Sequence, residues 1–460
     1  MKMGMSNIER IFIGLCFLWL VYVWVTFGSS IPYLDSGIDF LQAHDFYTGG
    51  IPLLGSYWAS LHPPLKTTVV SMLFFLFGVS GRAYTLFGLL LGSISYFAFY
   101  TIVKKNTTSF LFLVGMMLIF LLYPLGIAGM IGGFTDYAVF TWCLLAWAGY
   151  CLNKRAVVVI ASLFAVLTKE SGVLLPGSLI LAEFIHTYAT KSKVQWKYIL
   201  VISSTILGLF VWLYILSFYG KGAWSDHILF EGYSSNGIIA ALQNIFLGGW
   251  KNPYALQNVL HVFIMNFHWV YWIISIMGVC IWMSSVFLHR KKYKIRRNAL
   301  LPAGIFALFY IIFVLSFPTY AIPRYVLPVS ASLFIFLLYG MKGYWRMHTI
   351  WYVICWAVLF VVSMAGLSRS IDPLSLRIWK PLKLDNQILY NMRDSFAGND
   401  GITYNLQESF LHNQRTAVIR NGTLFPRDCY QWRLYDPNND KRIFSILAIP
   451  VKHSTIDCLR

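Results

Sequence analysis

Long apolar stretches recur along most of this chain, with short polar connections between them. A helix needs about 20 mostly apolar residues to cross a bilayer. Hydrophobic residues make up 58% of the sequence and charged residues only 12%, against roughly 25% charged residues in an ordinary soluble domain. We therefore predict an all-α polytopic membrane protein with about 11 transmembrane helices. The predicted spans are residues 11–28, 83–103, 109–129, 136–152, 156–168, 172–188, 198–219, 259–288, 299–316, 325–341 and 349–367.

The basic residues between the spans indicate how the chain is oriented. Short loops rich in Lys and Arg stay in the cytoplasm. If the N-terminus is cytoplasmic, alternating the spans places every basic cluster between them on that side, at 104–105, 153–155, 191–197, 289–297 and 342–346. This agreement is lost if the apolar residues 65–78 cross the membrane, so we predict an interfacial or re-entrant helix there. The net charge of +18 therefore mostly records membrane orientation and does not indicate nucleic-acid binding.

The chain divides into a transmembrane domain and a polar tail. Residues 1–368 form the predicted transmembrane domain, with outside loops at 29–82 and 220–258. Residues 369–460 contain several prolines and apolar runs such as 443–451 that suit strands, which predicts a small extracytoplasmic α/β domain. In the tail, Cys429 and Cys458 can form a disulfide in an oxidising compartment, although two cysteines say nothing about geometry.

The first outside loop carries acids and a histidine that are candidate site residues. Asp35 and Asp39 are one helical turn apart, so they can share a face and hold a divalent cation. The alternative is that Asp35 caps a short helix and Asp39 is solvated. His62 lies just before the short apolar helix and can bind an anionic group there, or can be an interfacial structural residue.

Further charged residues interrupt apolar sequence on the same predicted side. Such residues usually face a protein interior or an aqueous cavity. Asp136 follows Gly-Gly-Phe-Thr at the start of a span, where it can be an ordinary helix N-terminal acid. Lys169 and Glu170 interrupt a hydrophobic hairpin and can pair with each other or with other polar groups. Arg324 can bind a phosphate, or can reach the interface at the end of its span.

Few basic residues remain outside the predicted cytoplasmic segments and the tail. They include those that we expect to bind a phosphate. They are Lys66, Arg82, Lys169, Lys221, Lys251 and Arg324.

The order of these motifs resembles that of the polytopic GT-C glycosyltransferases. An outside loop with acids comes first, followed by HPPL, Phe-Thr-Asp, LTKESG and PRYVLP. The sequence is most similar to glycosyltransferase family 39 and its relatives, which include protein O-mannosyltransferases and lipid A aminoarabinose transferases. The resemblance extends from about Ile11 to Leu367 and implies a GT-C fold with interfacial helices in the first outside loop.

The resemblance also implies a reaction. Family donors are polyprenyl-phosphate sugars, and Asp35 occupies the place of the proposed catalytic base, with Ser36 where the family usually has Glu. Attack by an acceptor hydroxyl needs a base near the nucleophile and positive charge near the departing phosphate. The resemblance places donor phosphate binding at His62, Lys169 and Arg324 and supporting acids at Asp39, Asp136 and Glu170, with a possible metal at Asp35 and Asp136.

The expected partners are the lipid bilayer, the lipid-linked sugar donor and a glycan, lipid or protein acceptor. The expected location is the bacterial inner membrane, with a cytoplasmic N-terminus and with the site and tail outside. A lipid-linked glycan flippase and a glycan polymerase or ligase remain alternatives, as does a non-catalytic scaffold. A transporter predicts charges on both sides of the midplane, whereas the acids before the tail lie almost wholly on the outside. This asymmetry favours chemistry at one surface.

Overall fold

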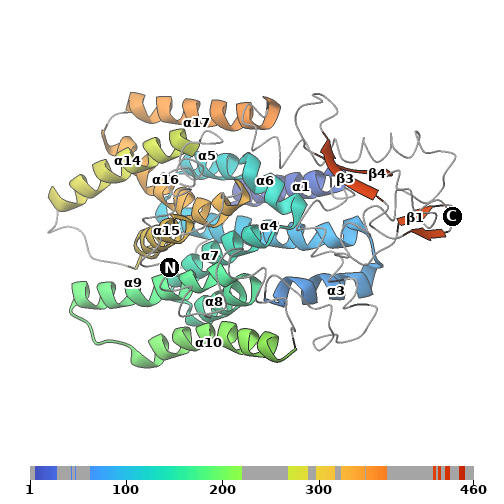
Figure 1. The fold of residues 1–460 in the computed structure, drawn as a ribbon. Coiled ribbons are helices and arrows are strands. Elements are labelled where there is room, and N and C mark those ends of the chain that lie inside the picture. Colours follow the sequence, from blue (N-terminus) through green and yellow to red (C-terminus); the bar gives the residue numbers. More distant parts are fainter. Residues whose placement is uncertain are drawn as a thin grey trace.

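The computed structural model describes residues 6–27, 63–219, 268–288, 297–315, 323–347 and 349–369, together with Ala43, Tyr47 and four strands. Each predicted span contains a helix (Figure 1). The spans before residue 153 correspond to α1 (Asn7–Phe27), α4 (Gly81–Asn106), α5 (Phe110–Leu121), α6 (Pro124–Gly132) and α7 (Thr135–Cys151). Those after it correspond to α8 (Arg155–Thr168), α9 (Leu174–Thr190), α10 (Trp196–Tyr219), α14 (His268–Leu288), α15 (Leu300–Leu315), α16 (Leu327–Met347) and α17 (Thr349–Arg369).

The predicted span over 109–129 is not one straight helix. The chain forms α5 and α6 with a bend of 54° between them. Pro124 is the cause, because proline has no amide hydrogen to continue the helix and disfavours helical geometry at the residue before it. Tyr123 is accordingly extended, with φ −69° and ψ 112°. The span is therefore broken, and α6 leads directly into the turn before α7.

The centre of the bundle is α7, which packs against α4, α8 and α16. Every residue of α7 except Leu145 is buried. Helices α14 and α16 approach each other closely. A Cβ added to Gly278 would lie 2.5 Å from the Gly340 backbone, and one added to Gly343 would lie 2.2 Å from the Gly278 carbonyl oxygen. Small residues at such interfaces let helix backbones approach closely in membranes.

The outer helices expose apolar side chains, as expected for a surface in contact with lipid. In the described part of the chain, four helices are long and apolar enough to cross a membrane, or five if the bent α5–α6 pair is one span. Several shorter apolar helices accompany them. The apolar character of the bundle is confirmed, whereas the expected count of about 11 spans stays a prediction.

The short helix predicted at 65–78 is present as α3 (Leu65–Phe77). It packs against α4 and α8, and its last residues, Phe75, Leu76 and Phe77, are exposed and apolar. Ala43 contacts this helix, because Ser71 donates a 2.7 Å hydrogen bond to its carbonyl oxygen.

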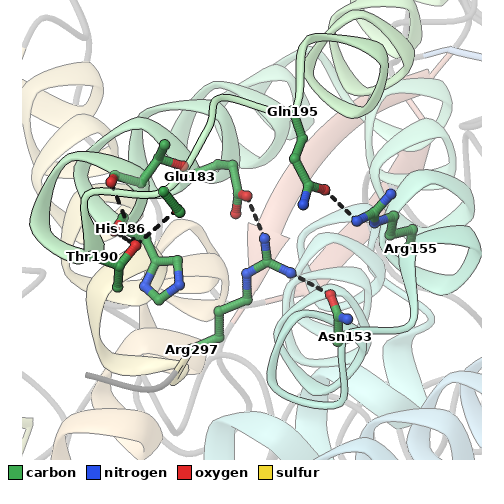
Figure 2. A network of polar contacts seen from close by, with 9 residues as sticks. Asn153, Arg155, Glu183, His186, Thr190, Gln195 and Arg297 are labelled. Carbon is green, nitrogen blue, oxygen red and sulfur yellow. Dashed lines mark hydrogen bonds and ion pairs between the residues drawn. The ribbon is translucent and has the colours of Figure 1, made fainter. Parts of the chain in front are cut away.

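Polar side chains from distant parts of the sequence meet at one end of the bundle. Arg297, which precedes α15, forms an ion pair with Glu183 of α9 and donates a hydrogen bond to Asn153 between α7 and α8 (Figure 2). Nearby, Arg155 donates a hydrogen bond to Gln195 (Figure 2). These residues lie in or beside connections predicted to be cytoplasmic. The structure confirms that these connections share one end, and the side of the membrane that this end faces stays a prediction.

Further pairs join predicted cytoplasmic ends of helices. Lys104 of α4 forms an ion pair with Glu9 of α1. Lys342 of α16 donates a 3.2 Å hydrogen bond to Asn106 at the end of α4. All these contacts agree with the alternation of spans deduced from the basic clusters.

The described part of the tail consists of two antiparallel strand pairs. They are β1 (Val418–Arg420) with β2 (Thr423–Phe425), and β3 (Tyr430–Tyr435) with β4 (Ser445–Pro450). Strand β4 confirms the strand expected within 443–451. Three predictions lie outside the described residues. They are the helices of an α/β domain, a bridge between Cys429 and Cys458, and the loop 220–258. The division at residue 368 also stays a prediction.

Candidate functional site

A tight turn between α6 and α7 positions Asp136. Gly133 ends α6 in the left-handed conformation, with φ 57°, and a Cβ there would lie 3.1 Å from a ring carbon of Tyr84. Both observations favour glycine at this position. The chain then reverses into α7, so that Asp136 lies in the first turn of that helix and is only 1% exposed. A negative charge is favoured at a helix N-terminus.

Lys169 reaches this carboxylate from the connection between α8 and α9. Its backbone is extended, with φ −156° and ψ 148°, and turns the chain into the 3₁₀ helix η1 (Glu170–Val173). A Cβ on Gly172 would lie 2.0 Å from the carbonyl oxygen of Ala165, so only glycine fits in this return. The Lys169 Nζ lies 2.6 Å from the Oδ1 atom of Asp136. The two charges therefore form a buried ion pair.

The ring of Tyr325 completes the surroundings of Lys169. The Nζ atom lies 4.6 Å from the ring centroid, which is a cation–π contact. Tyr325 belongs to the 3₁₀ helix η6 (Pro323–Val326), and Tyr310 of α15 donates a 2.6 Å hydrogen bond to its carbonyl oxygen. This bond holds the Pro-Arg-Tyr-Val segment beside the ion pair.

The environment keeps Lys169 charged. Burial alone lowers the pKa of this ammonium, but the nearby Asp136, Tyr325 and Glu170 raise it more, so that the pKa lies above its ordinary value of 10.5. Lys169 is 8% exposed and positive across the physiological pH range. The pair thus supplies a fixed cation in an apolar interior, held in place by a carboxylate and a ring.

The structure brings together some of the predicted site residues. Asp136 and Lys169 are in direct contact, Glu170 lies close enough to influence the charge of Lys169, and Arg324 belongs to the same 3₁₀ helix as Tyr325. Only the backbone of Arg324 is described. The predicted base Asp35, its neighbour Asp39 and the predicted phosphate ligand His62 lie outside the described residues.

Sequence reasoning missed the aromatic residues, and it named Lys66 only as one of the remaining basic residues, without a role of its own. Tyr325, Tyr310 and Tyr84 all take part in this region, but tyrosines are abundant in the chain and carry no charge signal. Lys66 is 2% exposed in α3 and lies over the ring of Tyr84, at 5.2 Å from its centroid. A lysine in an otherwise apolar helix was the available signal, and the motifs gave it no role.

The possible metal at Asp35 and Asp136 stays a prediction, because Asp35 lies outside the described residues. In the described ranges, no group of three or more His, Cys, Asp or Glu side chains gathers around a common point. One carboxylate oxygen of Asp136 already accepts the Lys169 ammonium. A cation at this position competes with a divalent ion for the same carboxylate.

No protein-family model and no curated protein matches the sequence. Among solved structures, ArnT from Cupriavidus metallidurans in the apo state aligns with a TM-score of 0.52 and 17% identity, covering 78% of this chain and 64% of that one. ArnT bound to undecaprenyl phosphate aligns with a TM-score of 0.50 and 17% identity, covering 82% and 70%. The chain has the fold of ArnT.

The ArnT fold is the polytopic GT-C-like architecture expected from the order of the motifs. With the apolar helices, it identifies the chain as a multi-pass integral membrane protein. The chain spans about two thirds of the length of the apo ArnT chain, at 64%. At 17% identity the likeness concerns the fold, and the candidate site has to be argued from the residues of this chain.

Proposed function

We propose that this protein is a membrane glycosyltransferase that uses a polyprenyl-phosphate-linked sugar donor. The observation that supports this most directly is the buried Asp136–Lys169 pair against the Tyr325 ring. Charged groups are costly at membrane depth and are usually retained there for function. The ArnT fold supports the same proposal, because one of the similar structures is bound to undecaprenyl phosphate.

The proposed reaction is a single inverting displacement. The acceptor hydroxyl attacks the anomeric carbon, its proton passes to the Asp35 carboxylate, and the bond between that carbon and the phosphate oxygen breaks. The products are the glycosylated acceptor and polyprenyl phosphate. Positive charge beside the phosphate stabilises the negative charge that develops as it leaves.

Three basic residues are assigned to that phosphate in this proposal. Lys169 is held by Asp136 and by the Tyr325 ring, so that its position is fixed before the donor binds. Arg324 is the neighbour of Tyr325 in η6, and His62 precedes α3. Preorganised charges of this kind need no rearrangement during the reaction.

The remaining acids have supporting roles in this proposal. Asp136 orients Lys169, and Glu170 adds a negative charge next to it. Asp39 is assigned to the acceptor side with Asp35, one helical turn away. The site and residues 369–460 face the extracytoplasmic side of a bacterial inner membrane, and the acceptor is a glycan, a lipid or a protein.

Sugar transfer by the purified protein tests this proposal. The full chain in lipid nanodiscs is incubated with polyprenyl-phosphate sugars and candidate acceptors, and both the transferred sugar and the released polyprenyl phosphate are measured. Asp35→Asn should lower turnover by roughly 100-fold or more, because a general base contributes about 10² to 10⁴ in rate. Asp45→Asn is the matched control, since it removes another acid of the same loop to which no motif gives a role.

Near-normal turnover of folded Asp35→Asn protein refutes the assignment of the base. Passage of an intact lipid-linked glycan across a vesicle membrane, without any sugar transfer, identifies a flippase instead. Transfer that requires a long saccharide donor identifies a polymerase or ligase.

A further inference from the structure

Exposed cations gather on two connections that meet at the predicted cytoplasmic end of the bundle. The two connections, α7 to α8 and α9 to α10, meet because Arg155 donates a hydrogen bond to Gln195 and because α8 packs against α10 (Figure 2). In the described part of the chain, no carboxylate forms an ion pair with any of these cations. We call them the basic surface, and they are Lys154, Arg155, Lys191, Lys193 and Lys197. Their positive charge is therefore not compensated by the described acids.

The side chain of Arg155 is held in place while it stays exposed. Its guanidinium lies 5.4 Å from the ring centroid of Tyr198, which is buried, and it donates a hydrogen bond to the amide oxygen of Gln195 (Figure 2). A ring and an amide orient a guanidinium without neutralising its charge. Arg297 at the same end differs, because it pairs with the Glu183 carboxylate. Arg155 thus presents an oriented positive charge at the surface of the bundle.

The residues beside the basic surface suit the boundary between lipid and water. Trp196 begins α10, is 60% exposed and packs edge-to-face against Phe184 of α9, with the ring centroids 5.8 Å apart. Tryptophan is enriched where a membrane meets water. Along α10, Leu200 and Val201 are exposed, and Ile160 is exposed on α8. The cations therefore continue into apolar helix surfaces on which acyl chains can lie.

We propose that the basic surface binds an anionic phospholipid, with its phosphate on Arg155 and its acyl chains along α8 and α10. A planar guanidinium can donate two parallel hydrogen bonds to phosphate oxygens, and basic residues clustered at the ends of membrane helices attract anionic headgroups. The orientation of the chain explains why these connections are basic, but it does not require an arginine held by an amide and a ring. The surface lies beyond the end of α7 opposite to Asp136, so this inference does not depend on the proposed function.

Lipid binding by the full-length protein in detergent micelles tests this proposal. Native mass spectrometry measures the affinity for phosphatidylglycerol and for phosphatidylcholine with the same acyl chains, and glycerol phosphate serves as a competitor without acyl chains. Arg155→Gln removes the charge, and Gln195→Glu supplies Arg155 with a carboxylate in place of the amide. Lys105→Gln is the matched control, because Lys105 is an exposed cation in the last turn of α4, at the same predicted cytoplasmic end. Thermal unfolding without added lipid establishes that each variant is folded.

The wild type should bind phosphatidylglycerol at least about 10-fold more tightly than phosphatidylcholine, because Lys154 and Lys197 repel the choline group. Arg155→Gln and Gln195→Glu should each weaken phosphatidylglycerol binding by roughly 10- to 100-fold, the range for one charge-assisted hydrogen bond, whereas Lys105→Gln should bind as wild type. If Arg155→Gln does not fold, Gln195→Glu decides alone.

Three results would overturn the proposal. The first is equal affinity of the wild type for the two lipids, or wild-type affinity in the folded variants. The second is an equal loss in Arg155→Gln and Lys105→Gln, because the attraction then comes from net charge and not from a site at Arg155. The third is displacement of the lipid by an equal concentration of glycerol phosphate, because the surface then binds free phosphate esters.

Discussion

Removal of the Asp136 charge should leave Lys169 as a buried ammonium without its carboxylate. In Asp136→Asn the geometry of the turn is kept, but the 2.6 Å ion pair is lost. Breaking a buried pair by neutralising one partner typically costs about 3 to 5 kcal/mol, because the remaining charge stays in an apolar interior. Since Asp136 is 1% and Lys169 8% exposed, we expect a loss in this range in the free energy of unfolding.

A double-mutant cycle isolates the interaction. Replacing both charges, in Asp136→Asn with Lys169→Met, leaves no uncompensated charge and is expected to cost less than either single change. The free energy of unfolding is measured for all four proteins in mixed micelles, under conditions in which unfolding is reversible. The coupling energy should reach at least about 2 kcal/mol. Strictly additive losses would refute the reasoning, because they would mean that the two charges do not interact in the folded protein.

The pH dependence gives a second readout of the same change. In the wild type the pKa of Lys169 is raised, so its contribution to stability is complete below the ordinary value of 10.5 and is lost only as pH rises through the raised pKa. In Asp136→Asn, the contribution of the carboxylate to this pKa is lost while burial still lowers it, so the pKa of Lys169 in the folded variant is lower than in the wild type. The deficit of the variant should therefore be larger at about pH 7 than at about pH 10. A deficit that grows with pH would contradict this account.

Three further changes should have distinct effects on stability and binding. Glu183→Gln removes the ion-pair partner of Arg297 at the opposite end of the bundle, so it should cost about 3 to 5 kcal/mol of unfolding free energy. Because this pair is far from the candidate site, the affinity for undecaprenyl phosphate should stay at the wild-type value in a binding titration. Gly172→Ala places a Cβ 2.0 Å from the Ala165 carbonyl oxygen and should destabilise by about 1 to 3 kcal/mol, measured as a shift of the unfolding midpoint. Gly133→Ala forces alanine to a φ of 57°, which costs about 1 to 2 kcal/mol, and should also lower sugar transfer by displacing Asp136.

Hydrophobicity and charge were sufficient to locate the helices. Each predicted span contains a helix because the bilayer requires every backbone group to be hydrogen bonded within the chain. The basic clusters also placed the connections correctly relative to one another, as the Arg297–Asn153 and Lys342–Asn106 contacts demonstrate. Such residues are grouped by the membrane itself, so their grouping at one end of the bundle can be read from the sequence.

The site was only partly predictable. Asp136 and Lys169 could be identified as candidates because charges stand out in apolar sequence, but their pairing across 33 residues of sequence could not be deduced. Tyr325 and Tyr84 act through the direction in which their rings face, which depends on helix packing. The break between α5 and α6 does not show in a hydropathy pattern, because hydropathy is averaged over many residues. The presence of Pro124 in the sequence could have predicted it.

The order of synthesis gives the Arg297 contacts a consequence for biogenesis. Asn153 and Glu183 leave the ribosome 144 and 114 residues before Arg297 does. During that interval, α9 carries a carboxylate that will be buried in the finished protein without the cation that will compensate it. In a nascent chain that ends before residue 297, the uncompensated Glu183 carboxylate favours a position of α9 near the membrane surface. Synthesis of Arg297 supplies the cation with which Glu183 pairs, and α9 can then dock fully into the bundle.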